Sequence, residues 1–141
     1  MKFDILIIGA GISGTMLARE LSRYKLKVAV LDKENDIANG ATMANSAIVH
    51  TGYDPEDGTL KAELNVRGAH LYPKLCEELN CRIKNTGAYV VACNSDEEKQ
   101  LDVLEERALR RDIPHEFLTG DEARKREPNL VDAITKVLSF P

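Results

Sequence analysis

The chain has 141 residues, the size of about one domain, and its 43% hydrophobic and 30% charged residues are ordinary for a protein with a moderate core. Its 19 basic and 23 acidic residues give a net charge of −4 without a basic block, which argues against a nucleic-acid partner. No run approaches the ~20 apolar residues of a membrane helix, and the N-terminal apolar segment lacks the basic leader and cleavage site of a signal peptide.

The first informative segment is a nearly continuous apolar run over residues 3–8, followed at once by a glycine-rich turn. The run is typical of a central parallel strand that is covered on both faces. Gly9, Gly11 and Gly14 then form the pattern G-x-G-x-x-G. The first glycine permits the tight turn, the second lets the backbone approach a pyrophosphate, and the third lets the helix pack closely on the strand. The pattern predicts a dinucleotide diphosphate at the N-terminus of the following helix.

A helix and a second strand are expected directly after this turn. Apolar residues recur there at helical spacing, namely Ile12, Met16, Leu17 and Leu21. The segment Val28–Leu31 predicts the second strand, and Asp32 ends it at about the 20-residue distance expected of an acid that binds ribose hydroxyls. With strand, turn, helix, strand and acid in this order, the sequence predicts a dinucleotide-binding unit.

A long polar loop and a kinked helix are expected next. The stretch Asn35–Gly58 is rich in Gly, Asn, Asp, Ser and Thr, and an irregular stretch of this length is more often functional than not. From Thr59 to Asn80 a leucine stripe predicts a helix, and Pro73 predicts a kink near residues 69–72. The stripe consists of Leu60, Leu64, Leu71, Leu75 and Leu79.

The remaining residues predict short strands and two capped helices. Arg82–Ile83 and Ala88–Ala92 look like strands that are joined by a turn at residues 85–87. Ser95-x-x-Glu98 predicts a capping box that opens a helix to about residue 111. The charges of this helix are interpreted as a solvated face and not as a binding patch; they are Asp96, Glu97, Glu98, Arg107, Arg110 and Arg111.

A strand and a final helix complete this reading of the chain. The strand is expected around His115–Leu118, and Thr119-x-x-Glu122 predicts a second capping box. The helix that this box opens must stop before Pro128.

The segment Thr42–Gly52 offers small polar side chains and a histidine between flexible residues. In a doubly wound fold the carboxyl ends of the strands face the ligand, so Asn45 and Ser46 could donate hydrogen bonds to a cofactor and His50 could reach its reactive end. A turn with a hydrogen-bonded histidine explains the residue types equally well. The other histidines, His70 and His115, are expected to be structural.

The three cysteines are Cys76, Cys81 and Cys93, an odd number without C-x-x-C spacing. Reduced structural thiols in a cytoplasmic protein are therefore expected, and no metal site is predicted.

These residues resemble a known family. The glycine turn, the strand that ends in an acid, and A-N-S-A-I-V-H-T-G-Y-D at residues 44–54 are similar to the flavin-dependent glycerol-3-phosphate dehydrogenases and oxidases. These enzymes belong to a broader group that includes D-amino-acid oxidase and L-2-hydroxyglutarate dehydrogenase. The likeness is tight over residues 1–58 and looser through 60–80, 86–92 and 126–130. It implies an α/β fold, with a Rossmann-like FAD-binding βαβ unit and the beginning of an α+β substrate domain.

The resemblance also implies FAD as the cofactor and a set of site residues. Those around the cofactor are Gly9, Gly11, Ile12, Ser13, Gly14, Asp32, Lys33, Thr42, Asn45 and Ser46. The glycines hold the diphosphate, Asp32 with Lys33 beside it holds the adenosine ribose, and the polar residues of segment 42–46 approach the phosphate and ribityl groups. His50 lies by the isoalloxazine as the base that deprotonates the substrate hydroxyl, a role that a neutral imidazole can fill at physiological pH.

The implied reaction is the oxidation of sn-glycerol 3-phosphate to dihydroxyacetone phosphate by hydride transfer to the flavin. Family members are several times longer, and their FAD domain is completed from their C-terminal half. The sequence is therefore interpreted as an N-terminal fragment, with residues 1–80 in the FAD-binding domain and residues 81–141 in a partial substrate domain.

Several alternatives stay open at the level of sequence. The substrate could be L-2-hydroxyglutarate or another 2-hydroxy acid, because no residue present discriminates between them. The glycine pattern also serves NAD-dependent dehydrogenases, although the Asn45–His50 segment argues against NAD. A non-catalytic dinucleotide-binding or partner-binding module is a further alternative. The electron acceptor, the oligomeric state and peripheral membrane attachment are not determined by the sequence, and the predicted partner is a small-molecule substrate.

Overall fold

The structure is a computed structural model that describes all residues from 1 to 141. The chain divides into two compact units, Met1–Ile48 (unit 1) and Val49–Pro141 (unit 2), and each is described by itself. None of the helices combines the length and the apolar run that crossing a membrane requires.

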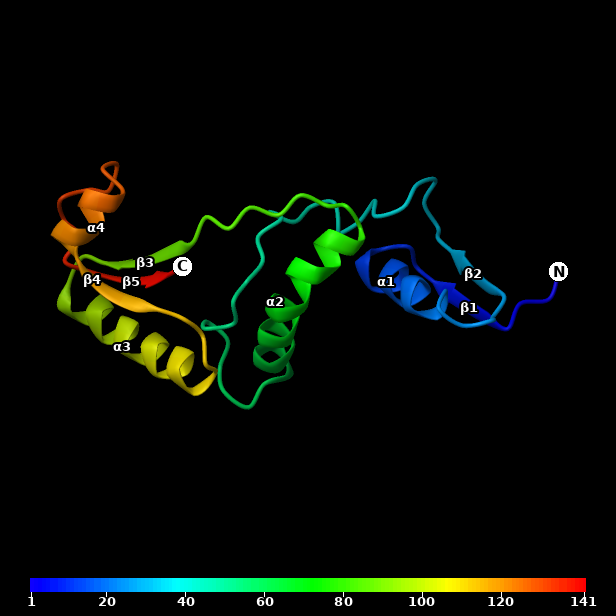
Figure 1. Cartoon of the computed structure of the whole chain (residues 1–141), viewed down its shortest axis with the longest axis horizontal. Helices are drawn as coiled ribbons and strands as arrows, with labels where there is room; N and C mark the ends of the chain where they lie inside the picture. The colour runs from blue at the N-terminus through cyan, green and yellow to red at the C-terminus, as the bar shows by residue number, and fades with distance from the viewer. The chain divides into compact units, whose positions relative to one another are not determined.

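Unit 1 is a βαβ arrangement, as the sequence predicts. Strand β1 (Ile5–Ile8) leads through the glycine turn into helix α1 (Ile12–Leu21), and strand β2 (Val28–Leu31) follows. The two strands pair in parallel with Ile5 opposite Val28 (Figure 1). No helix or strand lies between β2 and residue 60, which agrees with the predicted long loop.

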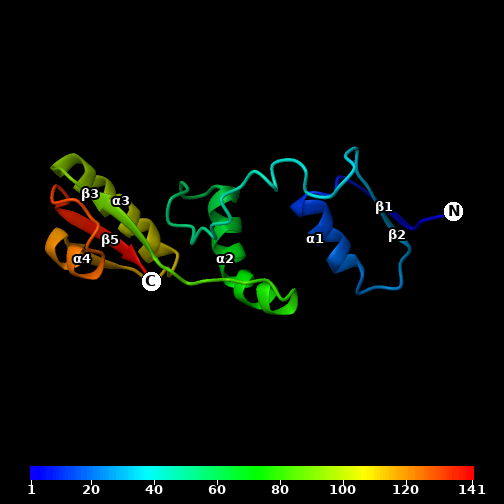
Figure 2. The same ribbon diagram turned by 90° about the horizontal axis from the view of Figure 1, so that it is seen from above.

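Helix α2 (Leu60–Glu78) opens unit 2 after its loop. The hydroxyl of Thr59 accepts a hydrogen bond from the amide of Ala62 and so caps the helix. Pro73 lies inside the helix, and Figure 2 shows the axis of α2 changing direction toward its C-terminal end, as expected from the missing amide. Of the predicted leucine stripe, four members are exposed: Leu60, Leu64, Leu71 and Leu79.

The rest of unit 2 is a three-stranded antiparallel sheet with a helix on each side. The strand order is β3 (Ala88–Ala92), β5 (Lys136–Phe140) and β4 (Glu116–Thr119). Helix α3 (Ser95–Arg110) lies along one side and helix α4 (Gly120–Arg126) along the other (Figure 1). Each side of the sheet has its own buried cluster. The α3 cluster is Ala92, Leu101, Ala108, Ile113, Leu138 and Phe140, and the α4 cluster is Leu118, Ala123, Ile134 and Val137.

Two local predictions for unit 2 are wrong. Arg82–Ile83 is not a strand, and β3 does not form a hairpin with it, because the partner of β3 is the distant β5. The cap of α3 is Asn94 rather than Ser95, since the Asn94 side chain accepts from the amides of Asp96 and Glu97. By contrast, the Thr119–Glu122 capping box is present, and α4 ends before Pro128 as predicted.

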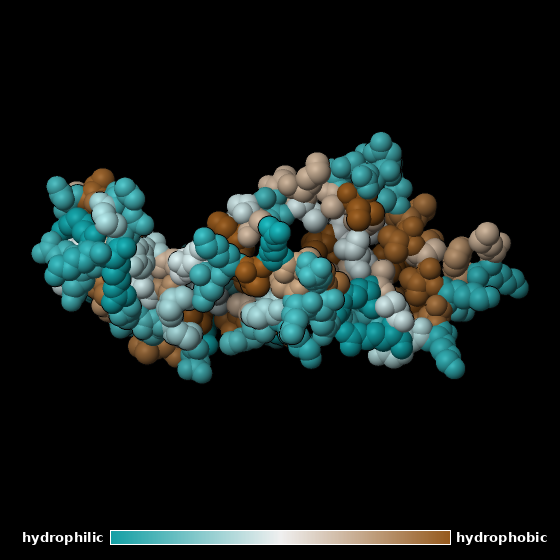
Figure 3. Space-filling model, turned by 45° about the horizontal axis from the view of Figure 1, so that its top comes forward, coloured by the Kyte–Doolittle hydropathy of each residue, from teal (hydrophilic) through white to brown (hydrophobic).

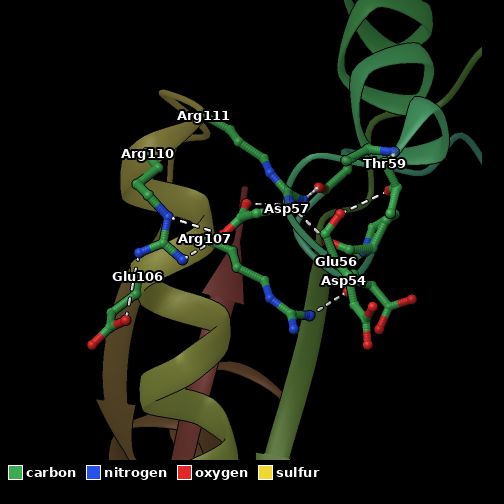
Figure 4. A network of polar contacts seen from close by, with 11 residues as sticks. Asp54, Glu56, Asp57, Thr59, Glu106, Arg107, Arg110 and Arg111 are labelled. Atoms are coloured by element: carbon green, nitrogen blue, oxygen red, sulfur yellow. Dashed lines mark hydrogen bonds and ion pairs between the residues drawn. The ribbon is translucent and has the colours of Figure 1, made fainter.

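The interpretation of the basic end of α3 as a solvated face is wrong for Arg111, whose side chain is only 10% exposed, whereas that of Arg110 is about half exposed. The guanidinium groups of Arg107, Arg110 and Arg111 contact the loop of residues 52–57 of the same unit (Figure 4). Carbonyl groups and one carboxylate of that loop need donors, and arginine supplies several in a fixed fork.

Candidate functional site

The glycine turn after β1 brings backbone atoms too close together for any side chain. Gly9 has φ +103° and donates its amide to the carbonyl of Leu31 at 2.7 Å, which ties the turn to β2. A Cβ atom on Gly14 would lie 1.9 Å from the carbonyl oxygen of Gly9. Only a residue without a side chain therefore allows α1 to approach the end of β1 this closely.

The N-terminus of α1 presents amides to the outside of this turn. Gly11 caps the helix without any side-chain bond, and the amide of Ile12 donates to the hydroxyl of Thr42 at 3.0 Å. The amides of Ser13 and Gly14 lie in the first turn, where no helix carbonyl can accept them. The turn thus keeps free donors at the positive end of the helix dipole, which suits an anionic group.

Asp32 at the end of β2 is folded back onto the same turn. Its Oδ2 accepts from the amide of Ala10 at 2.5 Å, and its Oδ1 accepts from the amide of Glu34 at 2.9 Å. These bonds, the Ala10 bond first, lower the pKa of Asp32 below its ordinary value, so the carboxylate is ionised at neutral pH. An ionised carboxylate has about four acceptor positions, so capacity for ligand hydroxyls remains. Lys33 is exposed and pairs with Glu34 at 3.5 Å.

The loop after β2 closes over the turn through backbone contacts that the sequence analysis did not anticipate. The amide of Ala38, a residue with φ +62°, donates to the carbonyl of Ala10 at 3.0 Å. The amide of Met43 in turn donates to the carbonyl of Ala38 at 3.1 Å. This folding brings Thr42 to α1. A positive φ at an alanine has no signature in the sequence.

The remaining predicted site residues differ in how far their side chains are already engaged. The Asn45 side chain donates to the carbonyl of Thr42 and accepts from the amide of Ala47 at 2.7 Å, so it first of all shapes its own loop. Ser46 is exposed. His50 is also exposed and belongs to unit 2. His115, expected to be structural, contacts the carbonyl of Ile113 at 2.7 Å.

The donor set fits the cofactor that the resemblance implies. Backbone amides at a helix N-terminus suit a diphosphate, and an ionised carboxylate at the end of the neighbouring strand suits ribose hydroxyls. The close approach at Gly14 is the geometry that the third glycine of this pattern provides.

Comparison with known proteins leads to the same family. The family model described as FAD dependent oxidoreductase matches residues 4–141. Glycerol 3-phosphate dehydrogenase of Caloramator mitchellensis is 44% identical over 137 residues, which cover 96% of this chain and 28% of that protein. Human mitochondrial L-2-hydroxyglutarate dehydrogenase is 37% identical over 132 residues, which cover 90% of this chain and 28% of that protein.

A solved structure, of dithionite-reduced L-alpha-glycerophosphate oxidase from Mycoplasma pneumoniae with FAD bound, matches with a TM-score of 0.86 and 32% identity. The match covers 99% of this chain and 38% of that one. The chain thus spans about a third of the length of the proteins that it matches. The matches confirm the resemblance seen in the sequence, its α/β fold class and FAD as the cofactor of the family.

Proposed function

Because this chain belongs to the family of FAD-dependent oxidoreductases, we propose that it forms the adenosine-diphosphate part of the FAD site in an enzyme that oxidises sn-glycerol 3-phosphate to dihydroxyacetone phosphate. The observation that carries the proposal is the glycine turn with Asp32 bonded to the amide of Ala10. The substrate assignment is supported by the 44% identity to a glycerol 3-phosphate dehydrogenase over 96% of this chain.

In this proposal unit 1 binds and orients the adenosine-diphosphate part of FAD. The first-turn amides of α1 at Ser13 and Gly14 donate to the diphosphate, and the Ile12 amide exchanges its bond to Thr42 for one to a phosphate oxygen. Asp32 accepts from the ribose hydroxyls while it keeps the Ala10 bond. Thr42, Asn45 and Ser46 approach the phosphate and ribityl groups, with Asn45 acting mainly through the loop conformation that it stabilises.

His50 in unit 2 is proposed to take the proton of the substrate hydroxyl on a ring nitrogen. Its exposed imidazole is accessible to a small molecule, and a neutral histidine is an effective base at physiological pH. When bound, FAD would accept the hydride from the carbon that bears this hydroxyl. The chain's own contribution is therefore cofactor binding, orientation and one proton acceptor.

A second candidate substrate is L-2-hydroxyglutarate or another 2-hydroxy acid. It is favoured by the 37% identity to the human L-2-hydroxyglutarate dehydrogenase. Both reactions oxidise a secondary alcohol, so they use the same base and cofactor. The predicted domain division at residue 80 and the cytoplasmic location remain proposals, the second supported by three cysteines that are all free thiols.

The test uses the protein in the form that its cells make, loaded with FAD. Flavin absorption bands should survive desalting, and steady-state assays should give turnover with sn-glycerol 3-phosphate and little with L-2-hydroxyglutarate. The opposite preference would replace the first substrate by the second, and tight FAD binding without turnover would support a non-catalytic module.

The role of Asp32 is tested separately by Asp32→Ala. This variant should weaken FAD binding by about 10-fold or more, because it removes both the ribose acceptor and the Ala10 bond. Asp36→Ala is the matched control, since the Asp36 carboxylate accepts only from the adjacent amide of Ile37. Equal FAD affinity in the two variants would remove Asp32 from the site.

A further inference from the structure

The loop around and after His50 is not held by backbone–backbone hydrogen bonds. Residues 46–55 take part in no backbone–backbone hydrogen bond, and they belong to no helix, strand or hydrogen-bonded turn. Even so, Gly52 and Pro55 are buried. Buried carbonyl groups need donors, so something other than the loop itself must hold this segment.

The donors are two arginines in the last turn of α3 and the C-cap residue Arg111 that follows it (Figure 4). Arg111 donates from Nη1 to the carbonyl of Gly52 and from Nη2 to the carbonyl of Pro55 at 2.7 Å and to Oδ1 of Asp57 at 2.6 Å. Its side chain is only 10% exposed. Arg107 donates to the carbonyl of Asp54 at 2.6 Å.

Arg110 completes the group through an exposed pair. It donates from Nη2 and Nε to Oδ2 of Asp57, at 2.7 and 3.1 Å. Both side chains are about half exposed, so this pair is screened by solvent and contributes less than the contacts of the buried Arg111.

Apolar contacts also hold the same loop. Gly52 has φ +99°, and a Cβ atom there would lie 2.7 Å from Cγ2 of Val66 on α2. The ring of Tyr53 stacks on Phe140, with centroids 4.0 Å apart and planes 7° apart. Phe140 is 1% exposed in the core of unit 2, so the stack anchors the loop to a rigid element.

We propose that Arg111 is a positioning residue for His50, holding the loop so that the imidazole stays in its working place. The inference rests on the proposed function, because it takes His50 as the base. Only one residue separates His50 from Gly52, whose carbonyl Arg111 binds, so a shift of that carbonyl moves the histidine backbone directly. Lysine cannot replace the planar fork that reaches three acceptors at once.

A double-mutant cycle tests this in the FAD-loaded protein as its cells make it. The variants are His50→Ala, Arg111→Lys and the pair. The readout is the rate of flavin bleaching in anaerobic single turnovers at saturating sn-glycerol 3-phosphate. His50→Ala should slow bleaching by about 100-fold or more, the range of a lost general base. Arg111→Lys should slow bleaching by about 10-fold because it displaces the imidazole of His50. It should slow bleaching by almost nothing in the His50→Ala background.

Arg124→Lys is the matched control. Like Arg111, Arg124 reaches three acceptors in a loop, here the carbonyls of Val131, Asp132 and Ile134, but that loop does not carry His50. It should lower the thermal unfolding midpoint much as Arg111→Lys does while leaving the bleaching rate unchanged. Arg107→Gln removes a single loop contact and serves as the milder variant, with an expected loss of about 2- to 3-fold in the same cycle.

The outcomes separate the two proposals. A normal bleaching rate in His50→Ala overturns the role of His50 itself. If that variant is slow but Arg111→Lys and Arg107→Gln slow bleaching equally with and without His50, or not at all, the positioning role is overturned and the proposed function stands. Loss of the Arg111 effect in the His50→Ala background, with Arg124→Lys active, supports both.

Discussion

Unit 1 and unit 2 differ in how much of their apolar surface they bury by themselves. In unit 1 only Ile7 and Ala10 are buried, and α1 buries none of its residues, whereas unit 2 buries a cluster on each face of its sheet. Figure 3 shows the hydrophobic surface gathered over the β1–β2 part of the chain. The exposed hydrophobic residues of unit 1 include Leu6, Ile8, Ile12, Leu17, Val30 and Leu31.

The difference teaches that the two units obtain their stability in different ways. A sheet of two strands is marginal in water unless other groups cover it. Unit 2 closes its own core, whereas unit 1 carries the nucleotide-binding turn on a framework that its own residues do not cover. A ligand that binds only the folded form adds its binding free energy to such a unit.

The largest expected effect is a difference in unfolding free energy between two leucine-to-alanine substitutions, one in each unit. Leu101→Ala removes a side chain that is 2% exposed in the core of unit 2, and it should lower the free energy of unfolding by about 2–5 kcal/mol. Leu17→Ala in α1 removes one that is 50% exposed and should change it by less than about 0.5 kcal/mol. Urea denaturation followed by circular dichroism measures both. Equal losses would show that unit 1 is as well packed as unit 2.

FAD should stabilise unit 1 far more than unit 2. At a free concentration about 100 times its dissociation constant, a ligand stabilises the folded form by about 2.7 kcal/mol. Hydrogen exchange in β1, α1 and β2 should therefore slow by up to about 100-fold with FAD, while exchange in β3, β4 and β5 changes little. Mass spectrometry of peptides resolves the two units, and uniform protection across both would break the comparison.

Gly14→Ala is the companion variant for that measurement. Its Cβ atom would lie 1.9 Å from the carbonyl oxygen of Gly9, so helix and strand must separate and the protection by FAD should disappear. Gly40→Ala lies in the same unit with no atom within 4 Å of the added Cβ, and it should keep the protection.

A smaller effect, a gain in stability, is expected from a substitution in α2, the helix of unit 2 with a largely exposed leucine stripe. Gly68→Ala adds a methyl group into open space inside this helix and should stabilise the protein by about 0.5–1 kcal/mol. Gly52→Ala is the contrast, because φ +99° and Val66 oppose a side chain there. A thermal shift assay should give opposite signs for the two variants.

Much of unit 1 and the helices of unit 2 could be predicted because their signals are local. The G-x-G-x-x-G pattern, the strand before it and Asp32 after it lie within one short stretch, and the Thr119–Glu122 box spans four residues. Each signal reflects contacts between near neighbours in the chain.

The missing parts are contacts between distant residues. Strand β5 pairs with β3 across more than forty residues, so nothing beside Ala88–Ala92 in the sequence indicates its partner, and the prediction of a strand at Arg82–Ile83 is wrong. The acceptors of Arg111 lie more than fifty residues before it. A long loop without internal partners beside three arginines on one helix end is the signal that could have suggested this contact.

The smallest effect concerns the carboxylate that these arginines hold. Hydrogen bonds from Arg111 and then Arg110 lower the pKa of Asp57 below its ordinary value. A lowered folded-state pKa gives stability that is present above the unfolded pKa of about 3.9 and is lost as the pH falls through the folded pKa. Asp57→Asn should therefore lower the unfolding midpoint slightly at pH 7, and the gap to the parent protein should close below about pH 4.

Thermal unfolding from pH 7 down to pH 2 measures this gap, and Asp112→Asn, which removes a carboxylate outside the loop of Asp57, is the control variant. A gap that persists at the lowest pH would mean that Asp57 acts through shape and not through charge. If the gap closes at low pH, ion pairs with Arg110 and Arg111 stabilise the Asp57 loop in unit 2, the unit that also has its own buried core. The lowered pKa of Asp32 instead reflects hydrogen bonds from backbone amides in unit 1. The pKa values of both carboxylates are thus lowered, but for different reasons. Arginine side chains lower the pKa of Asp57 in unit 2, and backbone amides lower that of Asp32 in unit 1.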